Sequence, residues 1–355
     1  MALPFFNRTV RKRDQIMAID LGGRTTKAVL MQRKGDSFAL SRYALLDAPV
    51  QSKTFSPDML AEHLKSIVGT LDTKLRNVAL TIGVNDSIVR QAELPQLPIQ
   101  DMRQILKMNP KAYLQQDLPN HTFDCFIIPQ QSSKTDDKNK MGAISNKFKV
   151  LVAGAKKQLL DDLLTAVHKA DLIADGIVPS LIGPMNALEL AEPELFSKNV
   201  VALVDIGFKN TTICLLQQGE LVLSRVIAIG GDKITGGLAE SMGISYAEAE
   251  GIKMGMPSEV QPTLEALVSP LGRELRASID FFEHQQDKRV NQVLFSGGSA
   301  RSEFIVKILE AELSVSCKAW SPVSALQLAL PPQQIAEIEH VAPQLTVAIG
   351  TATSF

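Results

Sequence analysis

The chain contains few cysteines and no sequence cluster of metal-binding side chains, and these absences narrow what it can be. Its three cysteines, Cys125, Cys214 and Cys317, are scattered and lack C-x-x-C spacing, which fits neither a disulfide framework nor a zinc site. Its five histidines also stand apart from one another. We therefore expect the cysteines to be small core residues in a reducing compartment, and we expect no metal held by cysteine and histidine.

An excess of charge and a long apolar run are missing as well. Lysine plus arginine number 37 and aspartate plus glutamate 38, so no overall field attracts nucleic acid or acidic lipid. No apolar run approaches the roughly 18 to 20 residues of a membrane span. In the opening "MALPFFNRTVRKR" the basic residues follow the apolar ones, the reverse of a secretory signal. These features predict a cytoplasmic protein that binds no nucleic acid and has no direct membrane span.

What the chain does have is enough apolar sequence for two cores, and a long internal repeat. Its 355 residues, 45% of them hydrophobic, correspond to roughly two domains. Each half begins with three strand-like runs in a row, which predicts mixed sheets with hairpins instead of a parallel doubly wound sheet. A repeat of this length predicts two related lobes. With an offset of 185 positions, it aligns Asp20 with Asp205, Gly22 with Gly207 and Thr26 with Thr211.

The expected organisation has four parts and one insert. Residues 1–15 form a tail, 16–185 a first lobe with a small inserted subdomain at about 94–147, 186–340 a second lobe, and 341–355 a buried closing helix. The tail either touches a membrane surface or a partner through its aromatic and basic residues, or is disordered. The polar stretch "QQSSKTDDKNKMGAISNK" is expected to be an exposed, mobile loop.

The repeated stretch suits phosphate binding. A strand that ends in aspartate and turns on glycine exposes backbone N–H groups, which together with the hydroxyls of Thr25 and Thr26 can cradle phosphate oxygens. Lys27 adds a cation, and the aspartate can hold Mg²⁺ through water. A single such turn is more often an ordinary one. Two facing turns would clamp a polyphosphate from both sides, and Gly297 with Gly298 offers bare backbone to a flat adenosine.

The same stretches resemble a known superfamily. "IDLGGRTTKAV", "VDIGFKNTTI" and "LFSGGSARS" are similar to the first phosphate, second phosphate and adenosine motifs of actin, heat-shock chaperones and sugar kinases. Within that superfamily the chain most resembles the PilM family of actin-like type IV pilus assembly proteins. Further matches such as "GIVPSLIGPMNALEL", "LGRELRASIDFFEHQ" and "VAIGTAT" extend the resemblance from Ile16 almost to the end. It implies an α/β, actin-like (ribonuclease H-like) fold of duplicated lobes with mixed sheets and an inserted small subdomain.

The resemblance also implies a site for ATP and Mg²⁺ between the lobes. Glu250 and Lys253 would reach the ribose and base, although they could instead be an ordinary solvated i, i+3 pair. Asp20 and Asp205 would hold the metal through water. The full set of expected contacts is Asp20, Gly22, Gly23, Thr25, Thr26 and Lys27 from the first lobe, Asp205, Gly207, Lys209, Thr211, Gly230 and Gly231 from the second, Glu250 and Lys253, and Gly297, Gly298 and Ser299 at the adenosine.

A protein partner is implied as well. In the PilM family a groove of the first lobe binds the short cytoplasmic amino-terminal segment of PilN, a single-span inner-membrane protein. The insert at 94–129 matches the small subdomain that helps to form this groove. Its Ile99, Met102, Ile105 and Leu106 either receive such a peptide or pack in the core, which we expect for at least two of them. The resemblance further implies a position peripheral to the inner membrane through partners, contacts with pilus motor components, and self-association.

The chain departs from the family pattern at three positions. Val84 stands where relatives commonly carry proline, and Gly23 and Arg24 stand in the first phosphate turn where small or hydroxyl residues are usual. Arg24 either adds a phosphate contact or points to solvent. Because the consensus of the insert is also loose, the partner could belong to a divergent pilus-like system.

Three functions follow from these features. The first is an ATP-binding scaffold that couples a cytoplasmic motor to membrane pilus components, with slow or absent turnover, because no carboxylate outside the two turns is placed as a general base. The second is a small-molecule kinase of the same superfamily that uses Asp205 as base. The third is a filament protein like FtsA, against which we note that no amphipathic anchor is expected at the carboxy terminus.

Overall fold

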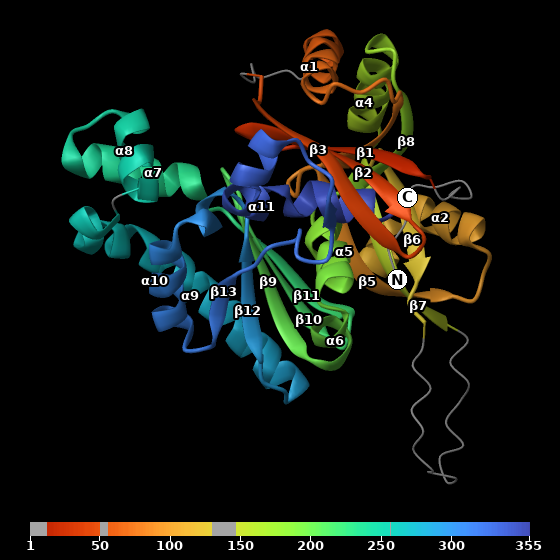
Figure 1. Cartoon of the computed structure of the whole chain (residues 1–355). Coiled ribbons are helices and arrows are strands. Elements are labelled where there is room, and N and C mark those ends of the chain that lie inside the picture. Colours follow the sequence, from red (N-terminus) through yellow and green to blue (C-terminus); the bar gives the residue numbers. More distant parts are fainter. Residues whose placement is uncertain (1–12, 50–55, 130–146, 256) are drawn as a thin grey trace.

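Figure 1 shows the computed structural model of the chain. It describes residues 13–49, 56–129, 147–255 and 257–355. Most of the expected tail and nearly all of the expected mobile loop therefore lie outside the described residues. Within the described ranges, no helix is long and apolar enough to cross a membrane.

The first large sheet combines two hairpins with parallel strands. Among the described residues this sheet has six strands, and its five longer ones are β1 (Gln15–Leu21), β2 (Thr25–Lys34), β3 (Ser37–Asp47), β4 (Asn77–Ile82) and β8 (Ile173–Pro179), in the order β3-β2-β1-β4-β8. β1 pairs antiparallel with β2 and parallel with β4. Ile16 to Asp20 are all buried, because both faces of the sheet are covered, and this explains why β1 is an unbroken apolar run.

The second large sheet repeats this plan. Its strands are β9 (Val200–Ile206), β10 (Thr211–Gln217), β11 (Glu220–Ile227), β12 (Gln292–Ser296) and β13 (Cys317–Ala319), in the order β11-β10-β9-β12-β13. β9 pairs antiparallel with β10 and parallel with β12, as β1 does with β2 and β4. The two sheets thus share one strand order, which confirms the predicted duplicated fold with mixed sheets.

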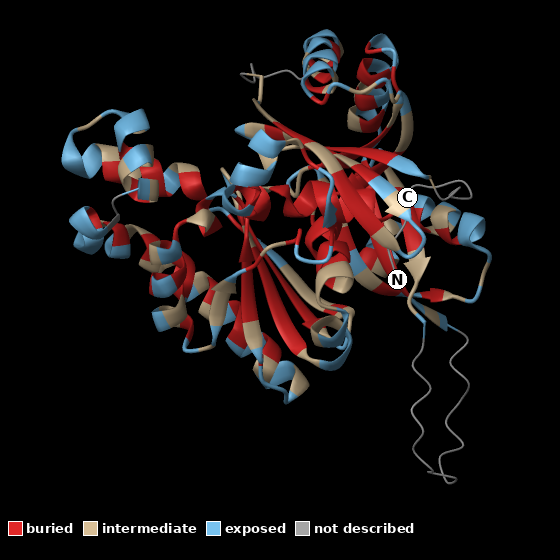
Figure 2. Cartoon of the chain, in the orientation of Figure 1, coloured by how far each residue is buried: buried red, intermediate tan, exposed pale blue. Residues whose placement is uncertain are grey.

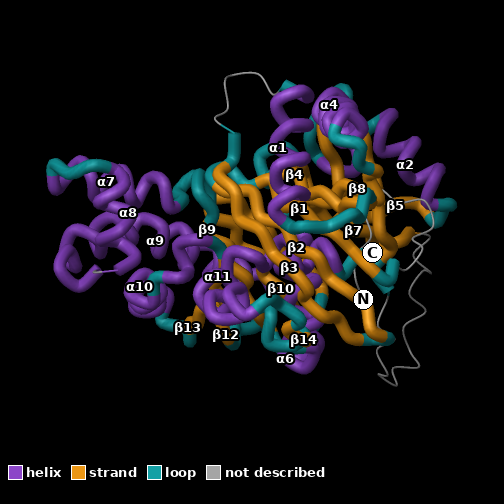
Figure 3. Tube along the Cα trace, turned by 45° about the horizontal axis from the view of Figure 1, so that its top comes forward, coloured by secondary structure: helices purple, strands orange, loops and turns teal. Residues whose placement is uncertain are grey.

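Two helices lie between the large sheets. α5 (Ile182–Ala191) and α11 (Pro332–Ala352) contact each other, and α11 also contacts β1 and β2; Figures 1 and 3 show α11 in this central position. α1 (Pro57–Thr70) and α4 (Lys157–Lys169) pack together on the other side of the first sheet. The expected boundary at residue 340 falls inside the continuous α11, and the short β14 (Gln327–Leu328) pairs with β3 of the first sheet.

Five further helices belong to the second lobe, and their exposed faces surround buried central strands (Figure 2). α9 carries an apolar stripe at helical spacing, with Leu271, Leu275, Ile279 and Phe282 all buried. These elements are α6 (Pro193–Lys198), α7 (Gly231–Met242), α8 (Tyr246–Gly255), α9 (Gln261–Gln286) and α10 (Glu303–Leu313), with 3-10 turns η1 (Pro257–Val260) and η2 (Gly298–Arg301).

The insert forms a third, smaller sheet. β5 (Ser87–Pro95), β7 (Lys147–Lys156) and β6 (His121–Ile127) pair antiparallel in that order, and α2 (Ile99–Met108) and α3 (Pro110–Leu114) cover them. Met102 and Leu106 are fully buried, Ile105 is partly buried, and Ile99 is exposed. The expectation that at least two of these four apolar residues pack in the core is therefore confirmed.

Candidate functional site

A cavity of about 620 Å³, hereafter the cleft, lies between the two large sheets and is bordered by the turns of both repeated hairpins. This volume is ordinary for a small-molecule site. The first turn is residues 22–24 between β1 and β2, and the second is 207–210 between β9 and β10. The expected site residues that line the cleft are Asp20, Gly22, Gly23, Thr25, Lys27, Asp205, Gly207, Lys209, Gly231, Glu250, Lys253, Gly297, Gly298 and Ser299.

Lys27 is the central cation of the cleft. Its Nζ lies 3.0 Å from Oδ2 of Asp20, its cross-strand partner, and the other Asp20 oxygen accepts a hydrogen bond of 2.8 Å from Thr81. Burial alone would lower the pKa of Lys27, but the carboxylates of Asp20 and Asp205 outweigh it and raise that pKa above its ordinary value. The lysine therefore stays charged while nearly buried.

Asp205 is the repeat counterpart of Asp20. Its Oδ1 accepts a hydrogen bond of 2.9 Å from Ser296, at the end of β12. Burial raises the pKa of Asp205, and the nearby Asp20 adds to the rise, while Lys27 and the Ser296 hydroxyl oppose it. One lysine that interacts with two carboxylates, Asp20 and Asp205, leaves the cleft suited to a further positive charge or to an anion that shares the lysine.

Glycine is required at both turns because a side chain there would overlap neighbouring atoms. A Cβ at Gly22 would lie 2.4 Å from Nζ of Lys27 and 2.5 Å from the carbonyl oxygen of Thr25. A Cβ at Gly207 would lie 2.9 Å from the carbonyl oxygen of Asn210. Gly297 has a φ of +91° and packs against Ile206, a conformation that side chains disfavour.

Two predicted threonines do not face the cleft. Thr26 is buried on the opposite face of β2, where its hydroxyl lies 2.8 Å from Nε2 of His63. Thr211 is likewise buried and donates to the carbonyl oxygen of Ile229 at 2.7 Å. Side chains alternate along a strand, so the residues beside them, Thr25 and Thr212, line the cleft instead.

Thr212 is a site residue that the sequence reasoning missed. It pairs across the sheet with Asp205, as Lys27 pairs with Asp20. The signal was available, because the 185-residue offset that relates Asp20 to Asp205 also relates Lys27 to Thr212. The second lobe thus places a neutral hydroxyl where the first places a cation.

Glu250 and Lys253 form an ion pair on α8 in which the lysine is buried and the glutamate is 27% exposed. Lys253 is 2% exposed, and its Nζ lies 2.7 Å from Glu250 and 2.8 Å from the hydroxyl of Thr235. Burial lowers the pKa of Lys253, although the Glu250 carboxylate opposes this. The solvated i, i+3 pair is therefore wrong for this chain.

Two other predicted contacts are engaged with protein groups. Lys209 lines the cleft, but its Nζ pairs with Asp232 at 2.6 Å. Gly230 lies outside the lining because it packs on the second turn, where a Cβ would come 2.3 Å from the carbonyl oxygen of Phe208. The N–H of Gly231 donates to the carbonyl oxygen of Gly207 at 2.9 Å. The start of α7 is therefore fixed to the second turn.

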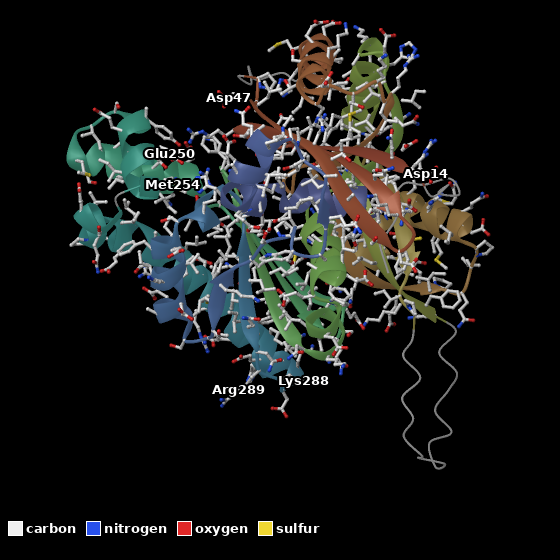
Figure 4. The ribbon with its side chains drawn as sticks, in the orientation of Figure 1. Asp14, Asp47, Glu250, Met254, Lys288 and Arg289 are labelled. Atoms are coloured by element: carbon white, nitrogen blue, oxygen red, sulfur yellow. The ribbon has the colours of Figure 1, made fainter. Side chains whose placement is uncertain are left out.

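Besides Glu250, two carboxylates outside the two turns also line the cleft. Asp86, in the loop after β4, lines it, and burial raises the pKa of Asp86 while Lys156 opposes the rise. Asp47, at the end of β3, lines it as well. Figure 4 places Asp47 on the same side of the molecule as Glu250 and Met254 of α8, which line the opposite wall.

A second cavity, of about 830 Å³, lies where the insert meets the second lobe. The insert contributes Phe126, Ile128 and Leu151, and the turn between β10 and β11 contributes residues 217–222. Gln91 donates to Glu220 at 2.8 Å across this junction. The Oε1 atom of Gln217, on the cavity wall, is buried and has no hydrogen-bond partner among the described residues. The cavity therefore offers apolar surface with amide groups at its edge.

Comparison with known proteins gives a family and a fold. The sequence pattern of the family described as "Type IV pilus assembly protein PilM" matches residues 18–354. The cell division protein FtsA of Bacillus subtilis (strain 168) is 26% identical over 259 residues, which cover 67% of this chain. The chain spans about 57% of the length of that relative.

Three solved structures share the fold. A PilM-PilN type IV pilus biogenesis complex matches 97% of this chain and 100% of its own with a TM-score of 0.80 and 20% identity. The ethanolamine utilization protein EutJ from Carboxydothermus hydrogenoformans matches 100% of this chain and 93% of its own, with a TM-score of 0.56 and 15% identity. MreB 5 of Spiroplasma citri, bound to AMPPNP, matches 96% of each chain with a TM-score of 0.51 and 10% identity.

Proposed function

Because the chain belongs to the family of the type IV pilus assembly protein PilM, we propose that it is a nucleotide-binding scaffold of a type IV pilus or related assembly machine. ATP binds in the cleft between the lobes. The cytoplasmic amino-terminal peptide of a PilN-like inner-membrane protein binds beside the insert. The protein thus works in the cytoplasm, peripheral to the inner membrane through its partners.

One observation carries the nucleotide part of the proposal: the turns of two repeated hairpins border one cleft, and Lys27, which pairs with Asp20 and also feels the charge of Asp205, lines that cleft. Exposed turn amides with a nearby cation form the usual surroundings of phosphate groups. The fold is also that of MreB 5, which was solved bound to AMPPNP. In this proposal Lys27, Thr25 and Thr212 contact phosphates, while Glu250 and Lys253 contact the ribose and base.

Mg²⁺ fits the same cleft. It keeps several of its waters and takes few protein carboxylates, and Asp20 and Asp205 both line the wall between the two turns. Asp20 and Asp205 would hold such an ion through water, and it would supply positive charge to the phosphates. Hydrolysis would be slow or absent, and Asp86, a carboxylate outside the turns, lines the same cleft.

Calorimetric titration of Mg-ATP into folded, nucleotide-free protein tests this part. We expect saturable binding that Asp205→Ala abolishes and that chelation of Mg²⁺ weakens. Asp36→Ala, at an exposed position in the turn between β2 and β3, is the matched control and should bind like the wild type. Absence of binding to the folded wild type would overturn the nucleotide proposal.

The peptide part rests on the second cavity. Its wall combines apolar side chains of the insert with glutamine amides, and the buried Oε1 of Gln217 lacks a donor among the described residues. Extended peptides bind such sites through main-chain hydrogen bonds and a few apolar anchors. The similarity to a PilM-PilN complex supports a peptide of this kind.

Peptide binding at the second cavity is tested by fluorescence anisotropy with a labelled synthetic peptide. The peptide has the sequence of the amino-terminal cytoplasmic segment of the PilN-like protein from the same organism. We expect Ile128→Glu, which places a charge on the cavity wall, to weaken binding at least tenfold. Ile173→Glu changes an isoleucine that is 53% exposed on β8, outside that wall, and should leave binding unchanged. Equal effects of the two substitutions would place the peptide elsewhere.

A further inference from the structure

Arg24 stands in the first turn, at a position where the family resemblance leads us to expect a small or hydroxyl residue. The carbonyl oxygen of Arg24 accepts a hydrogen bond of 2.7 Å from the N–H of Ala48. This bond holds the turn against the end of β3. The backbone of Arg24 is therefore fixed to the first lobe, while its side chain extends toward the second.

The guanidinium of Arg24 contacts two separate elements of the second lobe. Its carbon lies 5.8 Å from the ring centre of Phe208, in the second turn, and 5.6 Å from that of Tyr246, at the start of α8. Its Nη1 lies 3.5 Å from Oε2 of Glu250, one turn further along α8. Arg24 also lines the cleft, so the phosphate contact raised from the sequence stays a prediction, whereas these contacts with the second lobe were not foreseen.

The chemistry of arginine suits this position. A planar guanidinium stacks on aromatic faces and pairs with a carboxylate at the same time. Because the Arg24 side chain is 43% exposed, each contact is individually weak and can open. Together the contacts connect the first turn of one lobe to the helix that borders the cleft from the other.

Glu250 is the group through which this connection reaches the ligand. Among the described residues, its contacts with Arg24, Thr235 and Lys253 all fall on Oε2. Oε1 takes part in none of them, so the carboxylate can keep these contacts and still accept a hydrogen bond from a ligand hydroxyl. The contact of Arg24 with Glu250 is therefore compatible with an occupied cleft.

We propose that Arg24 is a positioning residue that fastens α8 to the first turn and thereby sets how tightly the cleft closes over the nucleoside part of a nucleotide. This rests on the proposed nucleotide function, although the contact itself forms without a ligand. A direct role at the phosphates is the competing assignment. The two differ in which part of the nucleotide depends on Arg24.

Calorimetric titration with ADP and with adenosine distinguishes the two assignments of Arg24. In Arg24→Met we expect the affinities for ADP and for adenosine to fall by the same factor, about three- to tenfold, because both contain the ribose and base. Arg289→Met removes an equal charge at an exposed site far from α8 (Figure 4) and should change neither. Loss of ADP affinity alone would assign Arg24 to the phosphates, and unchanged affinities would show that the contact has no role in binding.

A distance measurement tests the fastening without any ligand. Spin labels at Lys65→Cys on α1 and Met242→Cys on α7, both exposed, in a Cys317→Ser background, report the separation of the lobes. We expect Arg24→Met and Tyr246→Leu to lengthen and broaden the distance distribution in nucleotide-free protein, and Tyr246→Phe, which keeps the ring, to leave it unchanged. Identical distributions in Arg24→Met and wild type would overturn the proposal. A wild type that binds no ADP would instead refute the nucleotide function, while this measurement would still decide whether Arg24 fastens the lobes.

Discussion

Gly350 of α11 and Gly183 of α5 cross so closely that a Cβ on Gly350 would lie 1.7 Å from the carbonyl oxygen of Gly183. A Cβ on Gly183 would in turn lie 2.7 Å from the carbonyl oxygen of Val347. The two helices between the large sheets therefore meet backbone to backbone. α11 also lines the cleft through Gln344 and Val347, so this close crossing lies next to the candidate site.

Gly350→Ala should destabilise the protein by about 3 kcal/mol, because the obstructing atoms are backbone and the helices must move apart. Urea unfolding followed by circular dichroism measures the loss. Gly69→Ala is the matched control: Gly69 is helical with open space around a Cβ, so alanine should stabilise by up to about 1 kcal/mol. A Gly350→Ala protein as stable as wild type would contradict the close crossing.

Lys27→Met should impair both binding and folding. The two facing carboxylates would lose their shared cation, and phosphate would lose a charged partner worth about 1.5 to 3 kcal/mol. We therefore expect at least a tenfold loss of ATP affinity in calorimetry, together with a lower urea midpoint at pH 7. Lys34→Met, at the exposed end of the same strand, should change neither. Unaltered ATP affinity in Lys27→Met would place the phosphates elsewhere.

Much of the fold was predictable, because the information is local in the sequence. Glycine turns between apolar runs located the hairpins of both sheets, and the 185-residue repeat related one lobe to the other. The misplacement of Thr26 and Thr211 was avoidable. Because side chains alternate along a strand, Thr26 and Lys27 point to opposite faces of β2. The repeat offset of 185 residues, applied to Lys27, leads directly to Thr212.

Other features of the site could not be predicted from one sequence. The contact of Arg24 with Glu250 joins residues more than 200 positions apart, and it depends on the angle between the lobes, which no local pattern encodes. The place of Asp86 in the cleft depends on how the insert leaves the first sheet. The second cavity exists only where the insert and the second lobe meet.

Asp86→Asn should tighten nucleotide binding. Asp86 lines the cleft, and its carboxylate repels a polyanion bound in the same cleft. We expect ATP affinity to rise by about two- to fivefold and any slow hydrolysis to fall, as measured by calorimetry and phosphate release. Asp36→Asn, at an exposed turn, should have neither effect. Weaker binding in Asp86→Asn would show that the carboxylate supports the ligand.

His63 should make stability depend on pH between neutral and mildly acidic conditions. Burial lowers its pKa below the ordinary value, since the ring packs behind β2 with Nε2 at 2.8 Å from the hydroxyl of Thr26. Below about pH 6.5 the unfolded chain takes up a proton that the folded chain resists. The contribution of His63 is therefore present above that pH and is lost as the pH falls through 6.5 toward the folded value.

A comparison of variants separates the effect of His63 on stability from that of Asp205. Because the pKa of Asp205 is raised in the folded protein, proton uptake by Asp205 stabilises the fold as the pH falls, whereas proton uptake by His63 destabilises it. We expect urea midpoints to fall less between pH 7.5 and 5.5 in His63→Gln than in wild type, because glutamine can keep a hydrogen bond to Thr26 but takes up no proton. His284→Gln, at an exposed position on α9, should retain the wild-type slope. If His63→Gln and wild type lose stability equally over this range, proton uptake by His63 does not limit the fold, and the acid sensitivity must come from another group.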